Sequence, residues 1–185
     1  GYVIIAGAPN AGKSTLLNRI LGEKISIISS KPQTTRHRIL GVCHRPGAQI
    51  IFYDTPGIFV PNDALNLRIV DTALNSFSDA DVLLAVADAA DPDPKAEALL
   101  ADKLCDQKKL PIILALNKID LIADKKLLLE IITRWSSLGN FAALVPISAQ
   151  DGTQVEELLG AITRELPEGT PYFPEDNLTD ATERF

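Results

Sequence analysis

Short apolar runs alternate along the chain with stretches whose apolar residues recur at helical spacing. The runs predict six strands, at Tyr2–Ala6, Ile39–Arg45, Gln49–Tyr53, Val82–Ala87, Ile112–Leu116 and Phe141–Ile147. The amphipathic stretches predict five helices, at Lys13–Leu21, Asp63–Ser78, Lys95–Lys108, Asp124–Leu138 and Thr153–Leu166. Asp124 is placed to cap its helix, and Gly22 and Gly139 are placed to end theirs.

The order of these elements predicts an α/β fold. Pro46-Gly47 is a turn signal between two strands, which are therefore expected to pair as an antiparallel hairpin. Every other consecutive pair of strands is separated by a helix, which favours parallel pairing. We expect a mainly parallel six-stranded sheet with one antiparallel edge strand and helices on both faces.

The composition of the 185 residues is that of a globular protein, with 46% hydrophobic and 23% charged residues. This excludes disordered and collagen-like chains, and no apolar run approaches the roughly 18 residues of a membrane span. We expect one domain over residues 1–166, and residues 167–185, with three prolines, as a linker to another domain. The chain has no methionine and begins beside an apolar run, so we interpret it as a trimmed fragment.

Charge and cysteine content further limit the kinds of partner and environment that the sequence predicts for this protein. The net charge of −6 makes the surface as a whole a poor platform for a nucleic-acid backbone, so a polyanion would need a local site. Cys43 and Cys105 have no metal-ligand spacing and are expected to be reduced in a cytosolic protein.

The first loop carries the strongest chemical signal. The pattern G-x-x-x-x-G-K-[ST] is satisfied by Gly7, Ala8, Pro9, Asn10, Ala11, Gly12, Lys13 and Ser14, with Thr15 next in the chain. In such a loop, between a strand and a helix, backbone amides and the helix N-terminus bind phosphate. Lys13 would reach the β and γ phosphates, and Ser14 would offer its hydroxyl to Mg²⁺.

Two further segments complete the phosphate side of the predicted site. Asp54-Thr55-Pro56-Gly57 follows an apolar run, where Asp54 can hold Mg²⁺ through a water and the Gly57 amide can sense the γ-phosphate. The polar loop Ser29–Arg38 is expected to supply another hydroxyl to the metal; Thr34 and Thr35 are both candidates, and we prefer Thr35. The basic residues of this loop are either a solvated face or a contact with RNA or a ribosomal partner.

The segment Asn117-Lys118-Ile119-Asp120 predicts which base is bound. Guanine presents an N1–H and an amino group side by side, two donors that match the carboxylate of Asp120. Adenine presents an acceptor at N1, which would leave that carboxylate unpaired. Ser148 and Ala149 follow the last predicted strand, where an open α/β sheet gathers its ligand, and the Ala149 amide is expected to contact guanine O6. The predicted ligands are therefore GTP and GDP.

In this order the segments resemble the P-loop GTPase (G) domains of the translation-factor class. GAPNAGKST is similar to the GxPNxGKST of the Era, TrmE and EngA groups, and KPQTTRHRI resembles the QTTRxR of Era. The tail YFPEDNLTDATERF is similar to the segment that joins the GTPase domain of Era proteins to their KH domain. The chain is identified as a G domain of the Era family; Ala11 and Pro32 are minor departures from its patterns.

The resemblance implies a GTP-hydrolysing switch that assists maturation of the small ribosomal subunit. It implies that 16S rRNA is bound mainly by a KH domain that these residues do not contain. It also implies a cytoplasmic monomer with a peripheral contact to the inner face of the cell membrane. Lys13, Asn10, Thr35 and Gly57 are implied as catalytic residues, and Ser14, Thr35 and Asp54 as ligands of Mg²⁺.

Water activation is where the chain departs from Ras-like enzymes, which place a glutamine directly after D-x-x-G. Here that residue is Ile58, which neither donates nor accepts a hydrogen bond, so hydrolysis by the domain alone is expected to be slow. The γ-phosphate transition state also needs positive charge near the bridging oxygen. Asn10 stands where potassium-stimulated relatives carry an asparagine that ligates K⁺, and a K⁺ bound there and by carbonyls of the switch loop is expected to replace an arginine finger. The alternative is that Asn10 only closes the loop by hydrogen bonding.

Three other functions are alternatives to the GTPase switch. A membrane iron transporter has a nucleotide-gated domain that shares GxPNxGKS. An interaction module could bind nucleotide without turnover, and a P-loop kinase would use an adenine nucleotide. The kinase reading leaves Asn117–Asp120 unexplained.

Overall fold

The computed structural model of the chain describes residues 1–8, 10–22, 38–54, 80–106 and 110–173. The strands are β1 (Tyr2–Gly7), β2 (Arg38–Arg45), β3 (Ala48–Asp54), β4 (Val82–Asp88), β5 (Ile112–Asn117) and β6 (Ala143–Pro146). The helices are α1 (Lys13–Leu21), α3 (Pro94–Asp106), α4 (Lys125–Leu138) and α5 (Val155–Glu165), with a 3₁₀ helix, η2, at Ile119–Leu121.

The described strands form one sheet in the order β2-β3-β1-β4-β5-β6. Within it, β2 alone runs antiparallel to its neighbour, and the other pairs are parallel. The β2–β3 turn falls at Pro46-Gly47, where Gly47 has a φ of +73°, a backbone conformation that favours glycine. The predicted α/β fold, with its antiparallel edge strand, is confirmed.

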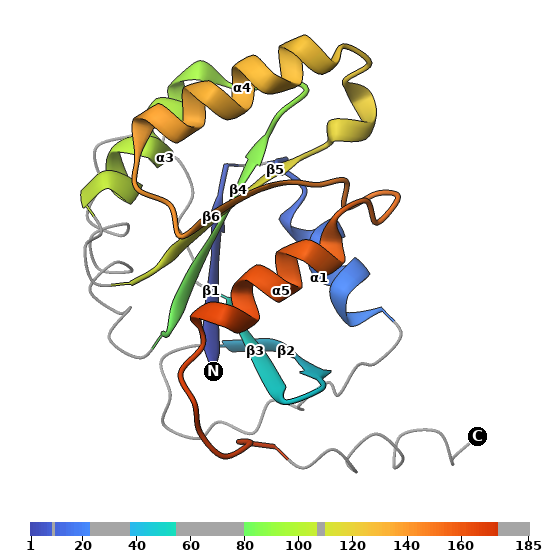
Figure 1. Cartoon of the computed structure of the whole chain (residues 1–185), viewed down its shortest axis with the longest axis vertical. Coiled ribbons are helices and arrows are strands. Elements are labelled where there is room, and N and C mark those ends of the chain that lie inside the picture. Colours follow the sequence, from blue (N-terminus) through green and yellow to red (C-terminus); the bar gives the residue numbers. More distant parts are fainter. Residues whose placement is uncertain (9, 23–37, 55–79, 107–109, 174–185) are drawn as a thin grey trace.

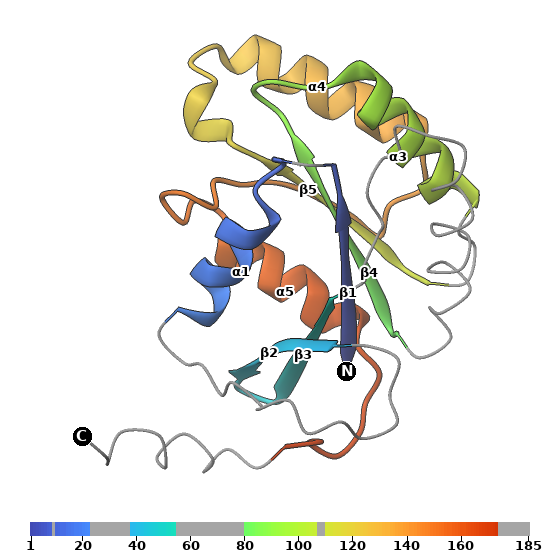
Figure 2. The same cartoon turned by 180° about the vertical axis from the view of Figure 1, so that it is seen from behind.

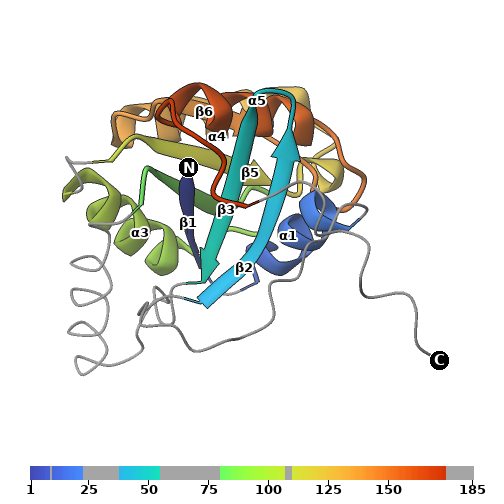
Figure 3. The same ribbon diagram turned by 90° about the horizontal axis from the view of Figure 1, so that it is seen from below.

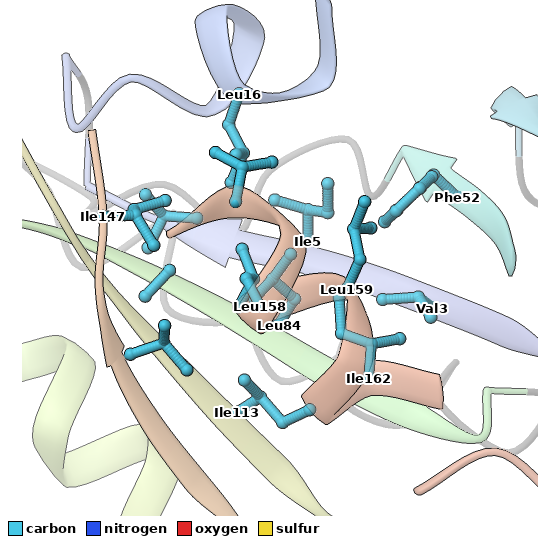
Figure 4. Packing of buried hydrophobic residues seen from close by; sticks show 14 of the residues in the cluster. Val3, Ile5, Leu16, Phe52, Leu84, Ile113, Ile147, Leu158, Leu159 and Ile162 are labelled. Atoms are coloured by element: carbon cyan, nitrogen blue, oxygen red, sulfur yellow. The ribbon is translucent and has the colours of Figure 1, made fainter. Parts of the chain in front are cut away.

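Helices cover both faces of the sheet, with α1 and α5 on one face and α3 and α4 on the other (Figures 1 and 2). Because successive side chains of a strand point to opposite faces, each strand contributes to two apolar cores. In β1, Val3 and Ile5 join the core under α1 and α5, whereas Ile4 joins the core under α3 and α4. Figure 4 shows strand residues packed against Leu158 and Ile162 of α5.

The predicted and observed elements differ at their ends. The sequence predicts the last strand over 141–147, but β6 spans only Ala143–Pro146. Hydrogen bonds to β5 nevertheless continue at both ends, since Ala142 N donates to Ile112 O and Ile147 N donates to Leu116 O, each at 2.8 Å. Phe141, at the start of the predicted strand, packs edge-on against Trp135, with their ring centroids 6.4 Å apart. The predicted cap is confirmed: the Asp124 side chain accepts a hydrogen bond from Lys126 N at 2.8 Å. The helix predicted at Asp63–Ser78 lies outside the described residues.

No helix within the described ranges has the length and apolar character needed to cross a membrane.

Candidate nucleotide-binding site

The predicted site segments converge on the carboxyl edge of the sheet. The phosphate loop follows β1, Asp54 ends β3, Asn117 ends β5 and Ser148-Ala149 follows β6. Strand β1 lies between β3 and β4 (Figure 2). The strand order therefore reverses at β1: the chain passes from β1 to β2 and β3 on one side of it, and the later strands β4, β5 and β6 follow on the other side. A crevice at such a point is where open α/β sheets bind their ligands.

Part of the predicted site lies outside the described residues, so the roles of those residues stay predictions. They are Pro9, Thr34, Thr35, Thr55, Pro56, Gly57 and Ile58, together with the side chain of Asp54.

The phosphate loop is shaped by unusual backbone conformations. Asn10 and Gly12 have φ of +62° and +91°, and Gly12 immediately precedes α1. A Cβ added to Gly12 would lie 2.2 Å from Asn117 Nδ2, and one added to Gly7 would lie 2.3 Å from Val86 O. The sequence explains these glycines by the close approach of a ligand to the backbone. The structure gives a second reason, because atoms of the neighbouring strands leave no room for a side chain at either position.

Lys13 begins α1 and reaches back over the loop. Its Nζ donates to Gly7 O at 2.9 Å and to Ala8 O at 2.6 Å. Burial lowers the pKa of the Lys13 ammonium, because a low-dielectric surrounding disfavours its charged form. A phosphate group at this loop would offset that desolvation, so the lysine is placed to gain from binding an anion.

Asn117 connects the phosphate loop to the loop after β6. Its side chain is 2% exposed; Nδ2 donates to Ala11 O at 2.8 Å, and Oδ1 accepts from Ala149 N at 2.9 Å. The sequence places Asn117 in the base-recognition motif but gives no sign of this connection. The predicted contact of the Ala149 amide with guanine O6 stays a prediction, and it requires that N–H to be shared with Asn117.

Lys118 and Asp120 occupy the loop after β5. Lys118 has a φ of +70°, and its ammonium forms an ion pair of 2.5 Å with Asp88 Oδ2. Asp88 Oδ1 also accepts from Ala90 N and Asp91 N, each at 3.0 Å, so this carboxylate is held on both oxygens. Asp120 lies in η2 with an exposed side chain. Sequence reasoning missed Asp88, although its position at the end of an apolar strand was a usable signal.

Ser148 and Arg19 fix the loop after β6. Ser148 is fully buried; its N–H donates to Thr153 O at 3.0 Å and its Oγ accepts from Asp151 N at 3.2 Å. From α1, Arg19 Nε donates to Ala149 O at 3.2 Å. The sequence did not single out Arg19, which ties the helix of the phosphate loop to the base-side loop.

A cavity of about 260 Å³ lies between the phosphate loop and the start of α3, with Ala8, Asn10, Asp88 and Lys118 among its lining residues. Ser14 is exposed on the first turn of α1, where its hydroxyl is accessible as a metal ligand. Within the described residues, no three His, Cys, Asp or Glu side chains gather in a way that could hold a metal. The exposed Ser14 hydroxyl is a group that fits a Mg²⁺ bound largely by nucleotide oxygens.

Comparison with known proteins identifies the family. The family model described as "50S ribosome-binding GTPase" matches residues 2–118. The GTPase Era of Geotalea uraniireducens is 48% identical over 185 residues, which are 100% of this chain and 62% of that protein. The chain thus spans less than two thirds of the length of this relative.

Two solved structures resemble the chain closely. An Era variant from Aquifex aeolicus bound to GDP.AlF4⁻ matches with a TM-score of 0.74 and 45% identity, covering 97% of this chain and 61% of that one. Era in complex with MgGDPNP and nucleotides 1506–1542 of 16S ribosomal RNA matches with a TM-score of 0.73 and 45% identity, covering 95% and 60%. The resemblance to Era is confirmed, and the chain belongs to the 50S ribosome-binding GTPase family.

Proposed function

We propose that the chain is the GTP-binding and GTP-hydrolysing domain of a larger protein that acts in assembly of the small ribosomal subunit. The observation that carries this proposal is the Asn117 side chain, which joins the phosphate loop to the Ser148-Ala149 loop. It holds the phosphate-binding and base-recognising segments at one edge of the sheet. The similar Era structures contain GDP.AlF4⁻ in one case, and MgGDPNP with a 16S rRNA fragment in the other.

Each segment has a distinct task in this proposal. The amides between Gly7 and Ser14 and the Lys13 ammonium bind the phosphates, and Asp120 pairs with guanine. When bound, Mg²⁺ neutralises charge on the β and γ phosphates, and Ser14, Thr35 and Asp54 are its proposed protein ligands. The Gly57 amide is proposed to sense the γ-phosphate, so that loss of this group releases the loop that carries Thr35.

Hydrolysis by the chain alone is expected to be slow, because Ile58 cannot orient the attacking water, and the transition state needs positive charge near the bridging oxygen of the γ-phosphate. We propose that K⁺ supplies this charge, with Asn10 as a ligand; Asn10 is exposed at the loop and lines the 260 Å³ cavity. Steady-state GTPase rates in matched KCl and NaCl test this for wild type and Asn10→Ala. The proposal predicts a potassium stimulation that Asn10→Ala abolishes without loss of GDP affinity. Equal wild-type rates in the two salts would refute it.

Binding of 16S rRNA is proposed to occur mainly outside these residues, because a net charge of −6 gives little attraction for a phosphate backbone. A monomer in the cytoplasm with a peripheral membrane contact stays a prediction.

The experiment for the overall function is single-turnover GTP hydrolysis by this chain and by the longer protein, with and without small ribosomal subunits. The proposal predicts that the chain alone hydrolyses GTP slowly. Small ribosomal subunits should stimulate hydrolysis by the longer protein but not by this chain. GTP that stays bound and intact in every mixture would indicate a binding module without turnover.

A further inference from the structure

Among the described residues, three polar side chains are buried: Asn117, Ser148 and Gln49. The first two belong to the nucleotide site. Gln49 lies near the start of β3, at the edge of the sheet opposite that site, and its side chain is 7% exposed. Since burial of an unpaired amide is unfavourable, the partners of Gln49 indicate what it does.

The Gln49 amide is bonded to the segment that leaves α5. Its Oε1 accepts from Tyr172 N at 2.9 Å and from Phe173 N at 3.1 Å, and its Nε2 donates to Phe173 O at 2.8 Å. Nε2 also lies 3.3 Å from Nδ1 of His44, the residue opposite Gln49 in the hairpin. The Oε1 of this amide therefore accepts two hydrogen bonds from the segment, and its Nε2 donates one to the segment and contacts the His44 imidazole.

An aromatic stack adds a second attachment. The Tyr172 ring packs on Tyr2 with their centroids 4.7 Å apart, and Tyr2 stacks on Tyr53 at 5.0 Å with the planes 7° apart. Tyr53 is buried and immediately precedes Asp54. Phe173 packs against the core under α3 and α4. Figure 3 shows the segment after α5 crossing over β3.

The position of the hairpin in the chain gives these contacts a functional meaning. Strand β2 begins at Arg38, three residues after Thr35, and β3 ends at Asp54, directly before Thr55. Residues 38–54 are thus the covalent link between the two segments proposed to respond to the γ-phosphate. The described part of the chain ends at Phe173, within the residues 167–185 that the sequence predicts as a linker to another domain.

We propose that the face of the hairpin around Gln49 is a docking site for the exit segment Pro171–Phe173. Gln49 recognises the backbone of this segment, and Tyr2 accepts the Tyr172 ring. Through this site the hairpin carries the start of the linker with it when the nucleotide changes. The docking stands on the contacts alone, and its dependence on nucleotide rests on the proposed function.

Amide hydrogen exchange, measured by NMR on this chain, tests the docking. The proposal predicts protection of the Tyr172 and Phe173 amides, and an at least tenfold loss of that protection in Gln49→Leu. The amides of Ile51, which donates to Gly1 O at 2.9 Å, and of Leu83, which donates to Pro111 O at 3.0 Å, serve as internal controls and should keep their protection. Unchanged exchange at Tyr172 and Phe173 in this variant would overturn the proposal.

Gln49→Glu is the matched variant should Gln49→Leu fail to fold. Its carboxylate can still accept from the two amides, but it faces the Phe173 carbonyl with no proton to donate. We expect reduced protection factors for Tyr172 and Phe173 at pH 7 and their recovery as the pH falls and the carboxyl becomes protonated. Protection that does not change with pH in this variant would also count against the docking.

The nucleotide dependence is tested in the same spectra with GDP and with a non-hydrolysable GTP analogue. Wild type should show protection factors at Tyr172 and Phe173 that differ at least threefold between the two nucleotides, and Gln49→Leu should show no difference. Equal wild-type values, with both nucleotides bound, would overturn the coupling. Failure of either nucleotide to bind in a parallel titration would instead contradict the proposed function and leave the docking result readable.

Discussion

The phosphate loop and the two loops proposed to recognise the base, which follow β5 and β6, share one edge of the sheet but are held in shape by different means. The phosphate loop depends on backbone conformation and on the absence of side chains, as at Gly12 with its φ of +91°. The base side depends on side-chain hydrogen bonds, chiefly the two made by Asn117. The first region should therefore be sensitive to added atoms, and the second to removed ones.

The largest expected effect follows from adding one methyl group in the phosphate loop. Gly12→Ala introduces strain at a φ of +91° and puts a Cβ 2.2 Å from Asn117 Nδ2. We expect the free energy of unfolding to fall by about 2–4 kcal/mol, measured by chemical denaturation. Calorimetry should show an at least hundredfold loss of GDP affinity.

The matched control is Gly47→Ala in the hairpin turn. Gly47 has a φ of +73°, but an added Cβ would meet no heavy atom within 4 Å. We expect a loss of about 1 kcal/mol from backbone strain alone, with GDP affinity unchanged. If the two variants lose the same stability, the clash with Asn117 is not what makes Gly12 necessary.

Removing a side chain on the base side should have the next largest effect. Asn117→Ala leaves Ala11 O and Ala149 N without their partner in a buried position. We expect a loss of about 2–3 kcal/mol in the free energy of unfolding and an at least tenfold weaker binding of GDP. Asn140→Ala, at an exposed asparagine, should cost less than about 0.5 kcal/mol. A wild-type GDP affinity in Asn117→Ala would contradict the connecting role of Asn117.

The ion pair between Lys118 and Asp88 should give the smallest effect, because the side chain of Lys118 is still 30% exposed. Asp88→Asn keeps an acceptor for Ala90 N and Asp91 N while removing the charge that faces Lys118. A double-mutant cycle with Lys118→Met should give a coupling energy of about 1 kcal/mol in GDP binding. Additive effects of the two changes would mean that Asp88 does not act through Lys118.

Local sequence patterns were enough to predict most of the fold. Alternating apolar runs and amphipathic stretches predicted the strands and helices, and Pro46-Gly47 predicted the antiparallel hairpin. The predicted length of β6 was too long: Phe141 packs against Trp135, and Ala142 and Ile147 each make a single hydrogen bond to β5 from just outside the strand. A hydrophobic pattern locates a strand, but it does not report the backbone hydrogen bonds that decide where the strand ends.

The candidate site was predicted only as far as its motifs are continuous in the chain. The motifs of the phosphate loop and of Asn117–Asp120 could be read directly, because their chemistry lies in adjacent residues. The contacts of Asn117 with Ala11, of Lys118 with Asp88 and of Gln49 with Phe173 join residues far apart in the sequence. No local period encodes such pairs, and they became visible only when the sheet order placed the strand ends together.

The most direct test of the account is calorimetric titration of wild type and Asp120→Asn with GDP and with xanthosine diphosphate (XDP). Asp120 is exposed, so the change should leave the thermal midpoint unaltered. Because asparagine replaces an acceptor by a donor, wild type should prefer GDP and the variant should prefer XDP. A variant that keeps the wild-type affinity for GDP would contradict the placement of guanine against Asp120, and with it the assignment of this edge of the sheet as a guanine-nucleotide site.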